Sequence, residues 1–498
     1  IIGHDLKALI ESSVAPLVLT GTTLFDTRIA AWLTNPELKE YDLGRVAYDV
    51  AGLMVSDDNA ESVRIIWKLK SLLAERISAH ELNDIFQTLE MPLVPILTSM
   101  EHAGIQVDAK VIDELLTMAR TEVASLEERI YASTATTFNI NSPSQLSEVL
   151  FTKLGLKGKV RRTGGGVPST AAAELEKLRD EHPVIELILQ YRELNKLKTT
   201  YIEPFPSLID ASGRIHTTYN QTGTSTGRLS SSNPNLQNIP TRTELGQRFR
   251  AAFIAPAGFQ LVSLDYSQLE LRIVAHVAND ATMIEAFRNG EDIHTRTASE
   301  ILQVAPSDVT KDMRRQAKVL NFGIIYGMGV LGFARSAGVS RDTAKKFIDD
   351  YFVRFSGVAD YMERTKSEAF KNGYVSTLMG RRRPLPDIKS TMPQLAAQSE
   401  RMAINHPIQG TGADIVKLAM IAVDAQIRNL GTDSGIRMLL QVHDELVLEA
   451  PTSTLPDLAH TIAKTMEQVV SLSVPLVVEA KSGQHWASMQ HIDHVEQS

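Results

Sequence analysis

Two aspartates far apart in the sequence could form one metal-dependent phosphoryl-transfer site. The apolar run 260–264 predicts a short strand that ends at Asp265. Far downstream, two more strands are predicted around a charged tip: 438–442 and 446–449, with His443, Asp444 and Glu445 between them. Either aspartate alone would be explained as a helix cap or a turn residue. Because Mg²⁺ prefers carboxylate oxygens and substrate phosphates, two aspartates sharing one sheet edge are what a two-metal phosphoryl transferase requires.

One predicted helix between these aspartates carries cations and aromatic rings on the same face. Arg314, Lys318, Phe322 and Tyr326 recur every four positions, and at about 100° per residue they drift only slightly around the helix axis. Cations can neutralise a triphosphate, and an aromatic ring can pack on a sugar or a base. An amphipathic core helix has no use for cations on its buried stripe, so the pattern favours nucleotide binding.

A polar loop precedes the first aspartate. Residues 215–240 are rich in Thr, Ser, Asn and Gly, a composition that often marks only a linker. The loop also contains side chains suited to hydrogen bonds with sugar, phosphate and base edges: Arg228, Asn235, Gln237 and Asn238.

Positive charge is concentrated in a few places. The formal net charge of −8 gives no indication of nucleic-acid binding. Three basic runs nevertheless stand out: Lys153, Lys157, Lys159, Arg161 and Arg162 before a triple glycine; Lys311, Arg314, Arg315 and Lys318; and Arg381, Arg382 and Arg383. One run alone would be interpreted as a solvated face. Three runs in an acidic chain make phosphate binding by selected surfaces an equal alternative.

The composition is that of a multidomain globular protein. With 498 residues, 43% hydrophobic and 22% charged, the chain should fold as about two to four domains. No apolar run approaches the ~18 residues of a membrane span, and the start lacks the pattern of a signal peptide. The lack of cysteine excludes disulfides and thiolate metal sites and suits a reducing cytoplasm. A first residue other than Met indicates a fragment boundary.

The elements that position these motifs are mainly helical. Residues 1–90 predict a small α/β unit with a helical region at 60–86, and residues 92–208 are strongly helical. Period-3.6 spacing predicts helices at 111–131 and 169–197. Since these helices bracket the basic, glycine-rich tip, we expect a projection that could lie along a duplex.

The ordered set of motifs resembles the family A DNA polymerases. The resemblance is carried by the order of Thr226-Gly227-Arg228, the motif at Asp265, the helix 314–326 and His443-Asp444-Glu445. It runs through essentially the whole chain and includes Tyr191-Arg192 to Tyr201, Gly380-Arg381-Arg382-Arg383 and Gln409-Gly410-Thr411. It implies an α+β multidomain fold, a right hand of palm, fingers and thumb with a truncated exonuclease-like α/β domain at the N-terminus. The implied domains are the exonuclease-like unit 1–90, a thumb over 91–208, palm segments 209–284 and 417–498, and fingers over 285–416.

The same resemblance implies a DNA-templated DNA polymerase and assigns its nucleotide site. Asp265 and Asp444 would hold two Mg²⁺ ions, which Mn²⁺ could replace, with Glu445 auxiliary. The deoxynucleoside triphosphate would contact Arg314, Lys318, Phe322, Tyr326, His294, Glu270 and Gln268. Lys318 would also donate a proton to pyrophosphate. Tyr326 with Glu270 would close the space of a ribose 2′-hydroxyl, which makes DNA the product.

The implied partners are primer–template DNA and deoxynucleoside triphosphates. Matching positions assign contacts to the primer terminus, the template minor groove and the nearby duplex: Arg228, Asn235, Gln237, Asn238, Arg401, Asn405, Gln409 and His443. For two of the assigned residues a purely structural role is the alternative: His294 could simply begin a surface helix, and Gln409 could simply lie at the entry to a helix. We expect a monomer that has no membrane partner and works in the bacterial cytoplasm.

The N-terminal unit is predicted to have lost proofreading activity. In the family, an exonuclease with four metal-binding carboxylates precedes the polymerase. Here Leu9 stands where the second motif would have its aspartate, and Val55 and Asn59 stand where the third would have tyrosine and aspartate. The first motif would lie before residue 1. We therefore expect a structural remnant without hydrolytic activity.

Two rival functions remain at this point. A single-subunit RNA polymerase shares the right hand, but Glu270 beside Tyr326 argues against it. A duplex-binding protein with a dead polymerase site is the other rival, and the joint presence of Asp265, Asp444 and Arg314 argues against that.

Overall fold

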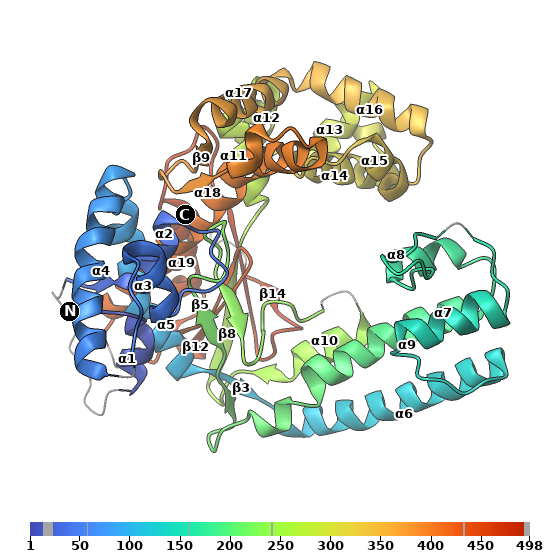
Figure 1. Cartoon of the computed structure of the whole chain (residues 1–498), viewed down its shortest axis with the longest axis horizontal. Coiled ribbons are helices and arrows are strands. Elements are labelled where there is room, and N and C mark those ends of the chain that lie inside the picture. The colour runs from blue at the N-terminus through green and yellow to red at the C-terminus, as the bar shows by residue number, and fades with distance from the viewer. Residues whose placement is uncertain (13–22, 57, 159, 241–242, 432–433, 493–498) are drawn as a thin grey trace.

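The chain folds into three regions arranged around one antiparallel sheet (Figure 1). The structure is a computed structural model and describes residues 1–12, 23–56, 58–158, 160–240, 243–431 and 434–492. We call residues 1–90 the N-terminal unit, residues 109–202 the arm, residues 281–372 the upper lobe, and the five-stranded sheet the central sheet. Because the helices are segregated from an antiparallel sheet, the predicted α+β class is confirmed.

The central sheet places a strand from the middle of the sequence between strands from its C-terminal part. Its order is β11-β12-β8-β13-β14, with bounds β8 (Phe259–Tyr266), β11 (Arg437–Val442), β12 (Glu445–Pro451), β13 (Val478–Gly483) and β14 (Gln490–His491). Successive side chains of a strand point to opposite faces. Val262 and Leu264 therefore enter one hydrophobic core, whereas Leu261 enters another on the opposite face.

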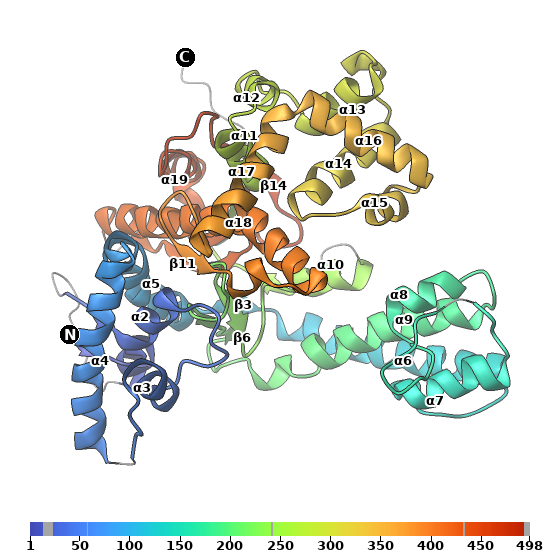
Figure 2. The same cartoon turned by 45° about the horizontal axis from the view of Figure 1, so that its top comes forward.

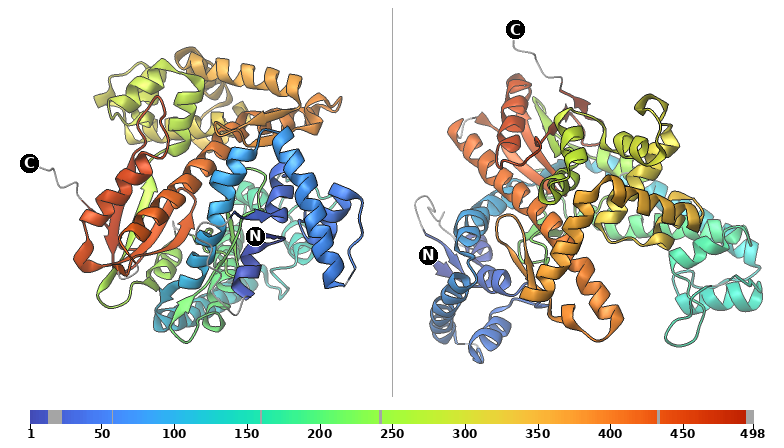
Figure 3. Two further views of the ribbon diagram at one scale, coloured as in Figure 1. Left: turned by 90° about the vertical axis from the view of Figure 1, so that its left-hand side faces the viewer. Right: turned by 90° about the horizontal axis from the view of Figure 1, so that it is seen from above.

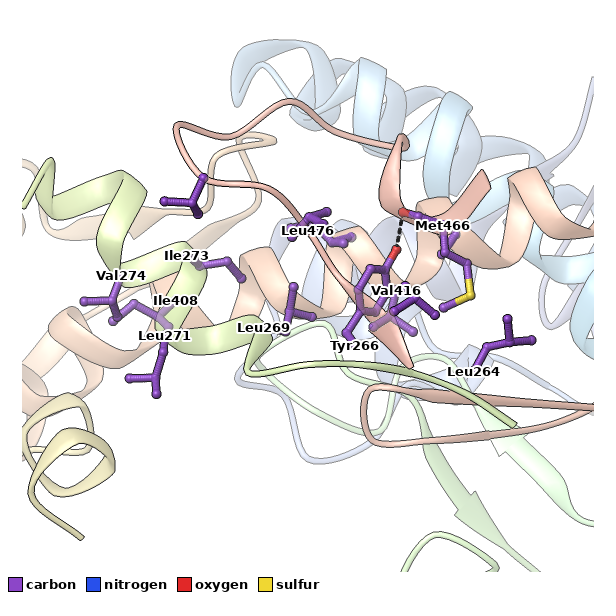
Figure 4. Packing of buried hydrophobic residues seen from close by; sticks show 14 of the residues in the cluster. Leu264, Tyr266, Leu269, Leu271, Ile273, Val274, Ile408, Val416, Met466 and Leu476 are labelled. Carbon is purple, nitrogen blue, oxygen red and sulfur yellow. Dashed lines mark hydrogen bonds between the residues drawn. The ribbon is translucent and has the colours of Figure 1, made fainter. Parts of the chain in front are cut away.

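Helices cover the Leu264 face of this sheet. They are α11 (Leu269–Ala278), α18 (Pro393–Asn429) and α19 (Asp457–Glu467). Figure 4 shows Tyr266 among their apolar side chains, and its hydroxyl donates a hydrogen bond of 2.6 Å to the carbonyl oxygen of Met466. Since Leu264 and Tyr266 are both buried, the strand is held rigidly on either side of Asp265.

The opposite face packs against an aromatic cluster. It contains Phe205, Phe249 from α10 (Glu244–Ala251), Phe253 and Trp486. Phe253 and Trp486 meet edge to face with ring centroids 5.5 Å apart, an arrangement that the charge distribution of aromatic rings favours. The cluster anchors the base of the arm against the sheet.

Two long helices carry the arm away from the sheet (Figure 2). Helix α6 (Ala109–Thr134), capped by the Asp108 side chain, confirms the helix predicted over 111–131. The predicted helix over 169–197 is wrong as one element, because it divides into α8 (Ala172–Leu175), the short turn η3 (Glu176–Leu178) and α9 (Val184–Leu197). Pro183, which precedes α9, has no N–H group to continue an earlier helix.

The tip of the arm contains the shorter elements and the first basic run. They are α7 (Pro143–Ser147) and η2 (Glu148–Lys153). After α9, η4 (Lys198–Ile202) and η5 (Phe205–Ser207) follow at the base of the arm, where Phe205 belongs to the aromatic cluster. Backbone pairing of Arg162 with Pro168 closes a small loop around the triple glycine. Lys159 lies outside the described residues. Of the other cations of the run, Lys153 ends η2, Lys157 and Arg161 precede this loop, and Arg162 begins it.

The upper lobe faces the arm and consists of helices joined by short turns (Figures 1 and 3). Their bounds are α12 (Ala281–Arg288), α13 (Ile293–Leu302), η6 (Pro306–Asp308), α14 (Lys311–Ile325), α15 (Val330–Ala337), α16 (Arg341–Arg354) and α17 (Ser356–Asn372). Thr310 caps α14 by accepting a hydrogen bond from the backbone N–H of Met313 at 3.2 Å. The helix ends at Ile325, so Tyr326 is its C-terminal cap and not a helical residue.

The N-terminal unit is a small α/β unit, as predicted. A parallel pair of strands, β1 (Ile2–Gly3) and β2 (Phe25–Asp26), lies beside α1 (Leu6–Ser12), α2 (Thr27–Thr34), α3 (Leu43–Ala51) and α4 (Asn59–Ala79). The continuous helical region predicted over 60–86 is wrong, because α4 ends at Ala79 and Glu81 has a left-handed backbone (φ 55°). The turn η1 (Ile85–Glu90) then leads into α5 (Met91–Ala103).

Small sheets link these regions. Their strands are β3 (Ile105–Val107), β4 (Arg214–Ile215) and β7 (Phe253–Ile254); β5 (Thr218–Asn220) and β6 (Ser230–Ser232); and β9 (Tyr374–Ser376) and β10 (Arg382–Pro384). The turns η7 (Pro386–Lys389) and η9 (Thr452–Thr454) complete the elements. Among the described residues, we find no helix long and apolar enough to cross a membrane.

Candidate functional site

Asp265 lies near the end of β8, and Asp444 lies in the hairpin that leads into the neighbouring strand β12, so the two aspartates share one sheet edge, as predicted. Strand β12 pairs antiparallel with β8 so that Glu445 is opposite Asp265. The backbone N–H of Tyr266 donates to the carbonyl oxygen of Asp444 at 3.2 Å. The hairpin turns through His443 and Asp444, and His443 has φ 57°, a region that bulky residues rarely adopt. The ladder thus holds both aspartates at one sheet edge.

The electrostatics of this edge favour a cation. Desolvation by the cleft walls, together with Glu445, Asp444 and Glu479, raises the pKa of Asp265 to about 7. The pKa of Asp444 rises to about 6, mainly through burial and despite the nearby Arg228. A divalent ion between the carboxylates would remove their mutual repulsion.

The donor set fits magnesium. The described residues contain no group of three or more His, Asp or Glu side chains arranged to hold a metal by themselves. Mg²⁺ is usually bound through one or two carboxylates, with waters and substrate phosphates as its remaining ligands. Asp265 and Asp444 supply such a pair at the edge of an open cleft.

A cleft of about 950 Å³ brings most of the predicted residues together. It is lined from the sheet, its hairpin, the polar loop and the start of α11 by Asp265, Asp444, Glu445, His443, Arg228, Gln237, Asn238, Gln268 and Glu270. From the upper lobe it is lined by His294, Arg314, Lys318, Phe322 and Tyr326. The shared face of Arg314, Lys318, Phe322 and Tyr326 is thereby confirmed. The carboxylates therefore lie across one cleft from a cationic and aromatic helix face.

The cations of α14 differ in their present contacts. Arg314 makes a bidentate ion pair with Asp292, with Nε–Oδ1 and Nη2–Oδ2 distances of 3.1 and 2.7 Å. Lys318 is exposed to the cleft. His294 is buried beside Asn321 at 3.0 Å, and burial lowers the pKa of His294 to about 4. At neutral pH, His294 is therefore an uncharged hydrogen-bonding group.

A hydrogen-bonded triad closes one side of the cleft. The carboxylate of Glu270 accepts a bond of 2.5 Å from the Tyr326 hydroxyl and one of 2.6 Å from Arg228 Nη2. Glu270 is almost completely buried, so both partners are fixed by one anchored carboxylate. The triad joins the start of α11, the polar loop and the end of α14.

Glu445 is held by residues that the motifs did not reveal. Its carboxylate accepts hydrogen bonds from Ser263 Oγ at 2.5 Å and from Trp486 Nε1 at 3.2 Å. The Arg250 guanidinium lies 3.9 Å from the Trp486 ring centroid and pairs with Glu445 at 3.7 Å. Sequence reasoning missed Arg250 and Trp486, because only the folded sheet brings three distant segments together.

Glu479 is a further carboxylate that the motifs did not reveal. Pairing of β13 with β8 puts it opposite Asp265 on the side away from Glu445. The strand-like run around Glu479 was a weak signal for a position on the sheet.

Four predicted DNA contacts lie outside the lining of this cleft. Asn235, Arg401, Asn405 and Gln409 are absent from the described residues that line it. Arg401 packs against Gly327, where an added Cβ would come within 2.8 Å of Arg401 Cγ. Asn235 Oδ1 accepts from the backbone N–H of Gln237 at 3.0 Å.

The basic run 381–383 is not a phosphate-binding surface, contrary to one of the two sequence alternatives. Arg381 is buried between Glu90 and Asp414. Arg382 and Arg383 pair with Glu81 and Glu37 of the N-terminal unit. The run therefore pairs with carboxylates of the same chain. A charge pattern along the sequence does not distinguish such pairing from the binding of an external phosphate.

Comparisons with known proteins agree with this geometry. A family model described as DNA polymerase family A matches residues 109–488. The thermostable DNA polymerase I of Thermus thermophilus is 46% identical over 496 residues, which cover 97% of this chain and 59% of that protein. DNA polymerase I of Pseudomonas aeruginosa is 44% identical over 510 residues, or 97% of this chain and 55% of the relative. The chain spans about half the length of the curated relatives it matches.

A solved structure has the same fold. It is described as the POL domain of Pol1 from M. smegmatis in complex with DNA primer-template and dNTP. It is 36% identical, with a TM-score of 0.91 over 98% of this chain and 86% of that chain. The described architecture is therefore the α+β fold of a polymerase domain.

Proposed function

This chain belongs to DNA polymerase family A, and from that premise we propose that it extends a DNA primer by templated addition of deoxynucleotides. The observation that carries the proposal is the cleft in which Asp265 and Asp444 face Arg314 and Lys318. Carboxylates able to hold cations and a helix able to hold phosphates lie on its opposite walls. The related structure that contains primer-template and dNTP supports these partners.

Asp265 and Asp444 are the proposed holders of two Mg²⁺ ions. Bound Mg²⁺ would activate the primer 3′-hydroxyl and neutralise charge on the triphosphate and on the leaving pyrophosphate. The protein's part is to orient the ligand oxygens, which the β8–β12 ladder does through the rigid strand around Asp265. Glu445 acts beside them and is positioned by Ser263 and Trp486.

The upper lobe supplies the proposed triphosphate contacts. Lys318 binds phosphate as a point charge and donates a proton to the leaving pyrophosphate. Arg314 exchanges its bidentate pair with Asp292 for phosphate oxygens when the nucleotide enters, and neutral His294 adds a hydrogen bond. Phe322 packs on the sugar, and Gln268 lies beside the metal-binding carboxylates. Closure of the lobe over a matched nucleotide would complete this arrangement.

Selection of deoxyribose is assigned to the triad of Glu270, Tyr326 and Arg228. The Tyr326 ring, held by the buried Glu270 carboxylate, fills the space that a ribose 2′-hydroxyl would need. A hydroxyl there would displace the ring or break the 2.5 Å hydrogen bond. This proposal favours a DNA polymerase over the RNA polymerase alternative.

The DNA duplex would lie between the arm and the upper lobe. Arg228, Gln237, Asn238 and His443 line the cleft and would contact the primer terminus and the minor groove. Outside the cleft, the proposed duplex and template contacts are Asn235, Arg401, Asn405 and Gln409. The cations of the arm's tip would follow the phosphates farther along the duplex.

The domain assignment follows from the same proposal. Residues 1–90 are an exonuclease-like remnant, 91–208 mainly a thumb, 209–284 and 417–498 the palm, and 285–416 the fingers. We propose that the remnant does not proofread, because Leu9 and Val55 have no metal-binding atom and Asn59 lacks the negative charge of a carboxylate. Leu9 lies on α1, and Asn59 is an exposed residue at the start of α4.

Primer extension tests the proposal directly. The chain with Mg²⁺, a primer–template and labelled deoxynucleotides should extend the primer, whereas Asp444→Ala should not. A wild-type chain that binds the duplex without extending the primer would instead support the duplex-binding alternative. Efficient ribonucleotide incorporation would support an RNA polymerase, and trimming of a mismatched end would contradict the loss of proofreading.

A further inference from the structure

A fully buried cluster of four charges lies behind the cleft and joins three parts of the chain. Glu90 ends the N-terminal unit, Arg381 lies between β9 and β10, and Asp414 and Lys417 are on α18. Lys417 Nζ is 2.7 Å from Glu90 Oε1, and Arg381 Nη2 is 2.7 Å from Asp414 Oδ1. Arg381 also pairs with Glu90. Each charge in the cluster has an opposite partner.

Together, the ion pairs affect the pKa of Glu90 more strongly than its burial does. Burial alone would raise the pKa of this carboxyl, but Lys417 and Arg381 lower it to about 2. The side chain of Trp32 covers the cluster, with its ring 5.2 Å from the Arg381 guanidinium and 5.1 Å from Lys417 Nζ. The cluster is therefore closely packed and is built partly from the N-terminal unit.

The polar loop 221–228 is fastened to this cluster at three points. Gln221 Nε2 donates to the Glu90 carboxylate at 2.5 Å and to the Glu90 carbonyl oxygen at 2.8 Å. Trp32 Nε1 donates to the carbonyl oxygen of Thr224 at 2.9 Å. Gly227, with φ +92°, lies so close to Arg381 that an added Cβ would come within 2.6 Å of its Nε. The next residue along the chain is Arg228.

Arg228 links the loop to the chemistry of the cleft. It pairs with Glu270 at 2.6 Å and opposes the rise in the pKa of Asp444. Lys417 from the cluster and Asp444 from the cleft also line one small cavity of about 40 Å³, together with Arg228. A shift of the loop would therefore move a cationic group in the cleft.

We propose that Trp32 and Glu90 of the N-terminal unit are positioning residues for polymerisation, because they fix the loop that presents Arg228 to the cleft. The inference rests on the proposed polymerase function. It assigns the N-terminal unit a part in catalysis that does not depend on exonuclease chemistry. Misplacement of a catalytic group by about 1 Å can lower a rate by as much as about 100-fold.

A double-mutant cycle between Trp32→Phe and Arg228→Ala tests this inference. Trp32→Phe keeps a ring over the cations and removes the donor to Thr224. Its rate of single-nucleotide incorporation, at saturating DNA and nucleotide, should fall about 10-fold or more, with little change in the KM for nucleotide. In the Arg228→Ala background, Trp32→Phe should lower the incorporation rate by less than about 2-fold, because Trp32 acts on the rate only by positioning Arg228.

Matched variants separate positioning from general damage. Trp67→Phe changes an exposed tryptophan of the same unit and should leave the rate unchanged. Gln221→Met removes the bond to Glu90 from the loop side and should reproduce the rate loss if Trp32→Phe fails to fold. Melting curves check folding of each variant.

Equal losses from Trp32→Phe in both backgrounds would overturn the inference, and so would a full rate for Gln221→Met. A wild-type chain without extension activity would sink the proposed polymerase function itself. That outcome is distinct, because it is read before any variant is compared.

Discussion

Two groups of charged side chains lie close together in this protein and are built in opposite ways. In the buried cluster of Glu90, Arg381, Asp414 and Lys417, every charge has an opposite partner. At the open sheet edge, Asp265 meets further carboxylates, and its pKa rises to about 7. Paired charges sealed from water hold structural elements together, whereas unpaired charges at a cleft are ready for a ligand. The same residue types thus serve opposite purposes.

The largest expected effect comes from removing a cleft carboxylate. Asp444→Asn should lower the rate of primer extension by at least about 1000-fold, because it removes a proposed metal ligand from the reacting centre. Its melting temperature without Mg²⁺ should stay equal or rise, since a repelled charge is removed. Single-turnover kinetics and calorimetry measure the two effects. An equally active variant would refute the metal-binding role, and strong destabilisation would show that the carboxylate is structural.

The matching change in the buried cluster should lower the stability of the fold, which Asp444→Asn should not. Glu90→Gln keeps the side-chain shape but leaves Lys417 and Arg381 without their shared carboxylate. Breaking a buried ion pair in this way costs about 3–5 kcal/mol, so the free energy of unfolding should fall by that order. Urea denaturation followed by circular dichroism measures the change. A loss below about 1 kcal/mol would mean that water or rearrangement replaces the missing charge.

The pH dependence of stability sharpens the contrast from another side. The pKa of Asp265 is raised from 3.8 to about 7 in the folded chain, so the folded state binds the proton more tightly than the unfolded state. The contribution of Asp265 to the free energy of unfolding is therefore largest below about pH 4, and it is lost as the pH rises from about 4 to 7. Asp265→Asn should flatten the fall in melting temperature over this range without Mg²⁺. Parallel curves for the two proteins would contradict the raised pKa.

The sequence identified the cleft better than the cluster. Arg314, Lys318, Phe322 and Tyr326 could be placed on one face, because helical periodicity is local and regular. The pairing of Asp265 with the hairpin at Asp444 also followed, because apolar strands marked both segments.

Relations between distant segments were harder to predict. The run 381–383 carries the same charges as a phosphate-binding surface, but its carboxylate partners lie far away in the sequence, in the N-terminal unit and on α18. Arg250 and Trp486 reach Glu445 only through the folded sheet. The breaks at His80 and Pro183 were missed because the apolar spacing continues across both of them.

The smallest expected effect concerns an exposed counterpart of the cluster. Glu81 pairs with Arg382, the neighbour of Arg381, but 83% of the Glu81 side chain is exposed. Exposed ion pairs contribute about 0–1 kcal/mol, because water and salt screen them. Glu81→Gln should therefore change the free energy of unfolding by less than about 1 kcal/mol, and the difference should vanish in high salt. Both variants replace a glutamate by glutamine. A difference between their changes in the free energy of unfolding, measured by urea denaturation, therefore reports the effect of burial and mutual pairing. If both variants lost similar stability, burial and mutual pairing would not distinguish the cluster from the surface.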